Sequence, residues 1–254
     1  MKSLLEERLH QLNWSHTASQ LDDLVENAST HNVSYFDFLH TIVSGEWEHR
    51  ESAELNRRIH RAKLPYTKTI HDFDLAFQPS LNEQRINETL TCRYIANGEN
   101  RLLLGPPGVG KTHLAIAFAL EALTQGYSVL FLTAADLVAE CHKAEAKGTV
   151  SRLIKKWTRP DLIVLDEVGY FPFDEFSANI FFQVISKRYE HGAMILTSNK
   201  SFIEWGKVFG DDVLATAILD RLLHHSVTFN IKGDSYRLKE KKKAGIYPAA
   251  PPVK

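Results

Sequence analysis

Cysteine is scarce in this chain, and its scarcity excludes two kinds of small domain. Cys92 and Cys141 are the only cysteines among 254 residues, and they lie far apart. A cysteine-based zinc module needs closely spaced pairs, and a disulfide framework needs several cysteines, so neither is expected. This usage is typical of a reducing compartment, and we expect a cytoplasmic protein.

Long apolar runs and an excess of one charge are also missing. No apolar run approaches the length of a membrane-spanning helix, and the first eight residues resemble an amphipathic helix rather than a secretion signal. Basic and acidic residues number 30 and 31, for a formal net charge of −1. A nucleic-acid-binding surface would therefore be a local patch.

The histidines, though numerous, lack the spacing of a metal site. The chain has 12 of them but no His-Glu-x-x-His pattern. His224 and His225 are neighbours, and adjacent residues of a helix point to different faces. The sequence therefore predicts no histidine metal site.

One stretch carries the strongest chemical signal. A short apolar strand at 101–104 enters a glycine-rich turn, and a helix with apolar residues at helical spacing begins at Lys111. This is the P-loop pattern G-x-x-x-x-G-K-T, in which backbone N–H groups surround phosphates, Lys111 reaches the β- and γ-phosphates and Thr112 holds Mg²⁺. A glycine turn without nucleotide is the weaker alternative. The residues predicted to bind ATP are Gly105, Pro106, Pro107, Gly108, Val109, Gly110, Lys111, Thr112 and His113.

Polar residues end two further apolar strands. The strand at 162–165 is followed by Asp166 and Glu167, and the strand at 193–198 is followed by Asn199. Beside a P-loop, Asp166 would complete the Mg²⁺ site with Thr112, and Glu167 would be the general base for the attacking water. Asn199 would orient that water, unless it is only a turn residue.

A segment whose charged residues are all basic lies between the second and third predicted strands. Residues 146–160 carry five cations and no acid. Such a helix is either an ordinary solvated surface or a surface that follows a phosphate backbone. The predicted DNA contacts are Lys147, Arg152, Lys155 and Lys156.

The sequence divides into three parts. Residues 1–65 read as all helix, and the third helix is expected to break near Gly45 and to continue, with a basic surface, toward Pro65. We interpret this part as a module for recruitment or DNA contact; its basic helix is either an ordinary solvated surface or a surface that contacts nucleic acid or a partner. Residues 66–243 form the nucleotide-binding domain after a connector and a helix near 82–96, and residues 244–254 are expected to be a disordered tail.

The assembled motifs resemble the AAA+ ATPases, and within them the DnaC-like branch. The P-loop, the Leu-Asp-Glu strand end, the Thr-Ser-Asn strand end and a late Asp-Arg-Leu carry this resemblance. From residue 181 to 244 the match tightens, and the chain looks like the IstB family, the transposition helper ATPases of bacterial insertion sequences. The segments that carry this second resemblance are 188–190, 197–200, 205–212, 219–225 and 235–239.

The resemblance implies more than the residues alone predict. It implies an α/β fold with a parallel sheet of order 5-1-4-3-2 flanked by helices, a small helical N-terminal domain and no C-terminal helical lid. It also implies a homo-oligomer with ATP at subunit interfaces, where a neighbour's Arg221 completes the site and Arg237 senses phosphate. The implied partners are duplex DNA, contacted mainly through its backbone, and the transposase of the same element.

Two other functions remain possible at this point. A helicase loader would share the fold and the ATP chemistry. A small-molecule kinase would need an acceptor pocket and would have no use for Glu167 as a base for water or for Asn199.

Overall fold

The protein consists of two compact units that divide between Arg57 and Arg58. The computed structural model describes residues 2–243, with side chains described up to Lys239, so the predicted tail 244–254 lies outside the described residues. The sequence placed the boundary after residue 65, whereas the structure divides inside helix α4 (Tyr35–Ala62). Each unit is considered by itself below.

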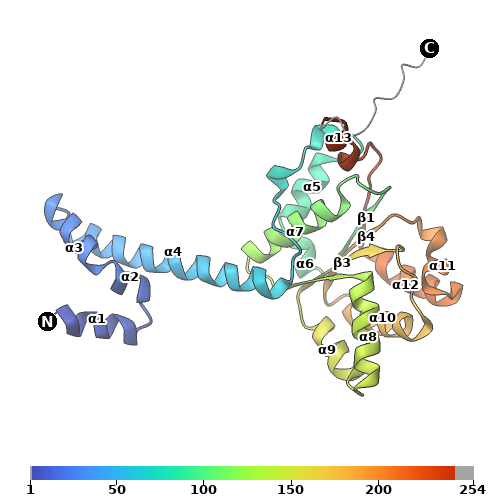
Figure 1. Cartoon of the computed structure of the whole chain (residues 1–254), viewed down its shortest axis with the longest axis horizontal. Helices are drawn as coiled ribbons and strands as arrows, with labels where there is room; N and C mark the ends of the chain where they lie inside the picture. The colour runs from blue at the N-terminus through green and yellow to red at the C-terminus, as the bar shows by residue number, and fades with distance from the viewer. Residues whose placement is uncertain (1, 244–254) are drawn as a thin grey trace, which may run out of the picture. The chain divides into compact units, whose positions relative to one another are not determined.

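The first unit is helical and has a small core. Helix α4 runs unbroken through Gly45, so the expected break there is wrong. A buried carboxylate joins α4 to α2, because Glu46 accepts hydrogen bonds of 3.0 Å from both the backbone and the hydroxyl of Thr17. Burial alone would raise the pKa of Glu46, but the hydrogen bonds from Thr17 and Arg50 hold it below its usual value. The other helices of this unit are α1 (Lys2–Gln11), α2 (Ser15–Ser19) and α3 (Leu21–Thr30) (Figure 1).

The second unit is built on a five-stranded parallel sheet of order β2-β3-β4-β1-β5. Read from the other edge this is 5-1-4-3-2, so the expected fold class is confirmed. The near-continuous apolar sequence of β1 to β4 follows from burial on both faces of the sheet. The strands are β1 (Asn100–Leu104), β2 (Val129–Thr133), β3 (Leu162–Val168), β4 (Ala193–Ser198) and β5 (Ser226–Asn230).

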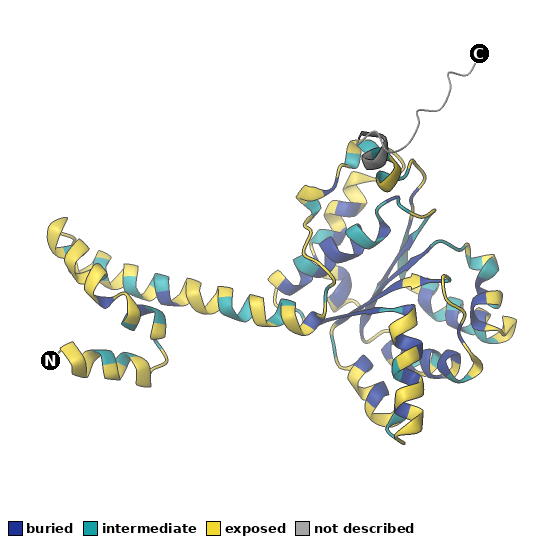
Figure 2. Ribbon diagram, viewed as in Figure 1, coloured by how far each residue is buried: buried dark blue, intermediate teal, exposed yellow. Residues whose placement is uncertain are grey.

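Helices cover both faces of this sheet (Figure 1). Helix α7 packs on one face, and α8 to α12 pack on the other, where they form the main core with β2, β3 and β4. Figure 2 shows the buried residues gathered along the sheet and on the helix sides that face it. The helices are α5 (Glu83–Leu90), α6 (Arg93–Ala96), α7 (Lys111–Thr124), α8 (Ala134–Ala146), α9 (Val150–Thr158), α10 (Glu175–Arg188), α11 (Trp205–Phe209), α12 (Asp212–His224) and α13 (Tyr236–Lys243), with short 3₁₀ turns η1 (Ile70–Asp72), η2 (Leu75–Phe77) and η3 (Phe202–Glu204).

The basic end of α4 belongs to the second unit and has protein partners there. The Arg58 guanidinium donates a 2.8 Å hydrogen bond to the Leu123 carbonyl at the C-terminal end of α7, which also accepts from the Gly126 backbone N–H. Lys63 lies 3.8 Å from Glu140 of α8. The basic character of this segment is thus partly structural.

Candidate functional site

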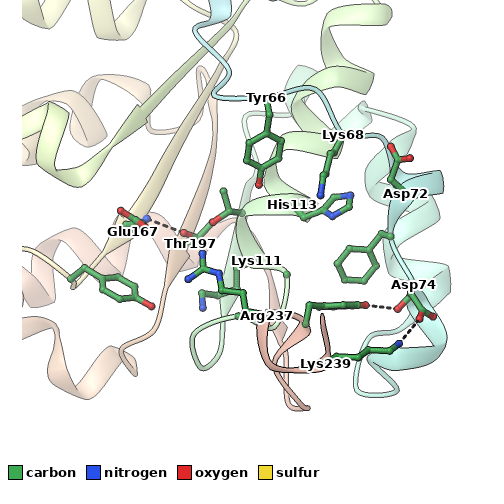
Figure 3. A pocket seen from close by; sticks show the side chains of 16 residues that line it. Tyr66, Lys68, Asp72, Asp74, Lys111, His113, Glu167, Thr197, Arg237 and Lys239 are labelled. Carbon is green, nitrogen blue, oxygen red and sulfur yellow. Dashed lines mark hydrogen bonds and ion pairs between the residues drawn. The ribbon is translucent and has the colours of Figure 1, made fainter. Parts of the chain in front are cut away.

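The polar residues of the site gather at the carboxyl ends of β1, β3 and β4. In an open parallel sheet this edge is where ligands bind, because loops there lie between helices that cover opposite faces. The P-loop follows β1, Asp166 and Glu167 lie near the end of β3, and Thr197 lies near the end of β4. Part of the P-loop, Glu167 and Thr197 line a cavity of about 460 Å³ together with the connector before β1 and with α13 (Figure 3). Asp166 does not line it but contacts the lining residues Thr112 and Thr197.

The P-loop backbone is shaped by glycines whose replacement by a larger residue would cause strain. Gly108 and Gly110 have φ of +84° and +96°, in the left-handed region that favours glycine. A Cβ on Gly110 would lie 2.5 Å from the Phe73 ring, and one on Gly108 would clash with the Ser235 hydroxyl. The connector and the start of α13 therefore lie directly against the loop.

Lys111 is buried and is held by the loop itself. Its Nζ donates hydrogen bonds of 2.7 Å and 2.8 Å to the carbonyls of Gly105 and Pro106. Burial lowers the pKa of Lys111, while the nearby Asp166 carboxylate opposes this effect. The ammonium group is thus desolvated at the first turn of α7, where the helix dipole also favours an anion.

Asp166 and Thr112 form the predicted cation-binding pair. The Thr112 hydroxyl lies 3.0 Å from each Asp166 carboxylate oxygen, and the Thr197 hydroxyl donates to the same carboxylate. Asp166 is 4% exposed, and burial raises its pKa although these hydroxyls act in the opposite direction. A buried carboxylate beside the hydroxyls of Thr112 and Thr197 fits a hard divalent cation such as Mg²⁺, which these oxygens would hold.

Glu167 differs from its neighbour in both exposure and backbone. Its side chain is exposed and lines the cavity, and its φ is +64°, which is unusual for a residue other than glycine. The register between β3 and β4 shifts between Leu165 and Val168, and the Glu167 N–H donates to the Thr197 hydroxyl instead of a strand carbonyl. This irregularity turns Glu167 into the cavity while Asp166 stays buried.

Only some of the remaining residues predicted for the nucleotide site line the cavity. His113 and Arg237 line the cavity with Gly108, Gly110, Lys111 and Thr112, and Figure 3 shows Arg237 pointing into it beside Lys111. Burial lowers the pKa of His113, whose Nε2 lies 3.0 Å from the Thr69 carbonyl. Predicted residues that do not line the cavity are Gly105, Pro106, Pro107, Val109, Asp166, Asn199 and Arg221.

Asn199 and Arg221 lie outside the lining for different reasons. The Asn199 side-chain oxygen is buried and has no hydrogen-bond partner in the described part of the chain, and Thr197 takes the lining position on β4. Arg221 projects from α12, where its guanidinium lies 4.7 Å from the centre of the Phe182 ring of α10.

One wall of the cavity was missed by the sequence reasoning. Phe73 makes an edge contact with His113 at 5.2 Å between ring centroids and a second one with Tyr236 at 5.6 Å. The Tyr236 hydroxyl donates to the Asp74 carbonyl at 2.5 Å. The available signal was a cluster of aromatic residues in the connector and in the Ser-Tyr-Arg segment, but nothing in it indicated that the two segments meet. Other lining residues found only in the structure are Tyr66, Lys68, Asp72, Tyr170 and Lys239.

The predicted DNA-contact residues lie on α9 and at the C-terminus of α8. Lys147, Arg152 and Lys156 line a groove of about 260 Å³ between these helices, whereas Lys155 does not. Lys143 also lines the groove, and the sequence reasoning missed it. Glu140 of α8 lies 2.6 Å from Lys156, so an acid from the neighbouring helix pairs with one of the four predicted cations.

Comparison with known proteins places the chain among relatives of nearly the same length. The profile of the IstB-like ATP binding protein family matches residues 7–244. The chain belongs to this family. It is 48% identical over 242 residues to a protein of Geobacillus stearothermophilus named as the ATP-binding protein of insertion sequence IS5376, covering 95% of this chain and 96% of that one. The corresponding protein of insertion sequence IS21 from Pseudomonas aeruginosa is 44% identical, with 95% and 91% covered. The expected family is thereby confirmed.

Solved structures share the fold of this IstB-like chain. AMPPCP-bound DnaA from Aquifex aeolicus matches with a TM-score of 0.58 at 24% identity over 73% of this chain and 57% of that chain. The DnaC helicase loader matches with a TM-score of 0.51 at 19% identity over 69% of this chain and 99% of that chain. The described residues contain no helix with the length and apolarity needed to cross a membrane.

Proposed function

We propose that this protein is an ATPase that assembles with ATP on duplex DNA and assists the transposase of the same insertion sequence. One observation carries the proposal: the P-loop, the Thr112–Asp166 pair and Glu167, which are far apart in sequence, converge on one cavity. Membership in a family of insertion-sequence ATP-binding proteins supplies the biological context.

The roles that we propose for the predicted site residues rest on their positions. Lys111 contacts the β- and γ-phosphates after leaving the loop carbonyls, and Glu167, which is exposed to the cavity, takes a proton from the attacking water. We assign to Asn199 the orientation of the same water, which requires its buried amide oxygen, unpaired within the described residues, to become accessible from the cavity. Mg²⁺, when held by Thr112 and Asp166, would neutralise part of the negative charge of the phosphates.

Arg221 supports the assembly part of the proposal. It does not line the cavity of its own chain, so it can stabilise the charge of the reacting phosphate only from a neighbouring subunit. Hydrolysis would then depend on contact between subunits, and the bound nucleotide would hold the oligomer together.

The groove between α8 and α9 supports DNA binding. Four cations line it against a single acid, Glu140. Exposed side chains of this kind contact phosphates rather than base edges, so binding should be weakly sequence-specific and should fall steeply with salt. These contacts would be made to the backbone of the duplex.

The first unit supports the recruitment part of the proposal. Phe36, Leu39, Val43 and Trp47 recur at helical spacing along one side of α4, and each is more than half exposed. An apolar stripe of this kind on a small helical unit is typical of a protein-contact surface. We assign it to the transposase.

A replicative helicase loader is the second candidate. Its support is the likeness to the DnaC helicase loader, which at 19% identity concerns the fold. Such a protein would carry the same ATP chemistry, but the partner would be a helicase and duplex DNA would not be required for assembly.

Sedimentation of the purified protein with a random-sequence duplex separates these functions. The Glu167→Gln variant is used because it should keep ATP while turnover nearly stops, so that the ATP-bound state persists. We expect a large complex with duplex in ATP and a small species in ADP, at one fixed salt concentration. A nucleotide-bound species that ignores duplex would favour the helicase loader.

A pair of matched variants tests whether the groove between α8 and α9 contacts the DNA. Arg152 lines the groove, whereas Arg159, at the end of the same helix, is exposed but does not line it. Arg152→Ala should weaken duplex binding and lower the salt slope by about one, and Arg159→Ala should change both much less. Equal losses in the two variants would show that the groove is not the contact surface.

A further inference from the structure

The C-terminal ends of α10 and α12 bring three metal-binding side chains together. Glu190, His224 and His225 each offer one ligand atom, and these atoms all lie within 4.8 Å of one another. The Glu190 carboxylate lies 3.6 Å from Nε2 of His225. All three residues are exposed, and none of them lines the nucleotide cavity.

The end of helix α12 explains why the two histidines approach. The prediction from sequence assumed that both residues were helical, and that premise is wrong. Helix α12 ends at His224, and His225 leaves it with φ of −120° and ψ of 77°. The two ring centroids consequently lie 4.1 Å apart.

A tyrosine orients the first histidine. The Tyr189 hydroxyl lies 2.6 Å from Nδ1 of His224, and the two rings stack with centroids 5.8 Å apart. In the tautomer in which Nδ1–H of His224 donates to the Tyr189 oxygen, Nε2 keeps its lone pair and can coordinate a cation. Metal-binding histidines are commonly held in this way through the second nitrogen.

The backbone holds the carboxylate in place. Glu190 has a φ of +62°, and a Cβ on Gly98 would lie 2.9 Å from its carbonyl carbon, so a glycine there lets the two segments approach. Both helices point their C-terminal carbonyls toward this region, which favours positive charge. The arrangement is therefore both constrained and suited to a cation.

From these observations we infer that Glu190, His224 and His225 bind a transition-metal cation of the Zn²⁺ type. Two imidazole nitrogens and one carboxylate are a donor set that suits zinc, copper or nickel, whereas Mg²⁺ prefers oxygen alone. With three protein ligands, water completes the coordination. The bound ion would tie α10 to α12 one helical turn beyond Arg221.

Cobalt substitution tests the site directly. The untagged protein is titrated with Co²⁺ in excess Mg²⁺, which fills the oxygen site at Asp166. We expect one equivalent to give the intense visible absorption of tetrahedral Co²⁺, and Zn²⁺ to displace it. His224→Gln and Glu190→Gln should each weaken Co²⁺ binding at least tenfold or abolish it.

A neighbouring histidine provides the matched control. His191 follows Glu190 directly and is also exposed, but it is not part of the group. His191→Gln should leave Co²⁺ affinity unchanged, whereas Tyr189→Phe should weaken it about tenfold and keep the tetrahedral spectrum. Circular dichroism confirms that each variant is folded. Equal affinity in the wild type and in a His224→Gln/His225→Gln double variant, or an equal loss in His191→Gln, would overturn the proposal.

Discussion

Two arginines on successive helices have opposite surroundings. Arg237 on α13 lines its own chain's nucleotide cavity, close enough for its charge to lower the pKa of Lys111, although burial is the larger cause of that shift. Arg221 on α12 donates a 3.1 Å hydrogen bond to the Ala217 carbonyl of its own helix and packs on Phe182. This difference supports the proposal that one chain binds the nucleotide by itself but needs a neighbouring subunit for hydrolysis. Nucleotide binding and hydrolysis should therefore separate by mutation.

Arg221→Ala should give the largest effect. We expect turnover to fall about a thousandfold or more, because a charge that stabilises the transition state is lost, while ATP affinity of the monomer stays unchanged. Steady-state hydrolysis and nucleotide binding measured on the same preparation check this.

A mixture tests whether Arg221 acts across an interface. Lys111→Ala cannot hold ATP but still offers Arg221 to a neighbour, so mixing it with Arg221→Ala should restore part of the turnover. If the mixture hydrolyses ATP no faster than either variant alone, then Arg221 acts on the ATP of its own chain or takes no part in hydrolysis.

Arg237→Ala should give an intermediate effect of another kind. Loss of a charged hydrogen bond to phosphate costs about 1.5–3 kcal/mol, or roughly ten- to hundredfold in ATP affinity. Because Arg237 lines its own chain's cavity, mixing Arg237→Ala with Lys111→Ala should not restore the lost ATP affinity. Titration with a fluorescent ATP analogue measures the affinity, and rescue in the mixture would contradict the assignment.

Lys239→Ala should give the smallest effect. Lys239 lies 3.1 Å from Asp74 and 3.9 Å from the centre of the Phe77 ring, so it helps to hold α13 against the connector. The pair is exposed, and we expect ATP affinity to fall by only about twofold. Lys232→Ala, at an exposed lysine just before α13, is the matched control, and an equal change in both would mean that docking of α13 is irrelevant to binding.

The sequence correctly indicated that the P-loop, Asp166 and Glu167 come together, because the P-loop pattern is local. The P-loop is one turn, so its glycines and Lys111 follow from neighbouring residues alone. Asp166 and Glu167 could be placed because the carboxyl ends of parallel strands share one edge. The strand order and the family followed from the resemblance of these motifs, and both are confirmed.

The opposite wall could not be predicted because tertiary contacts create it. Phe73 and Tyr236 are separated by most of the nucleotide-binding domain, and neither segment carries a signal for the other. The partner of Lys156 was missed for a similar reason, since Glu140 lies on the preceding helix. Patterns within one segment report charge and burial, but they do not report which segment packs beside it.

The hydrogen bonds of Lys111 to the carbonyls of Gly105 and Pro106 compete with any anion that binds Lys111 in the cavity. The P-loop already satisfies its own cation, so an incoming anion must replace two carbonyl dipoles before it gains anything. A polyphosphate brings enough charge for this exchange, whereas a single phosphate group gains little from it. We therefore expect this loop to bind polyphosphates in preference to single phosphate groups, because of the larger charge that they bring.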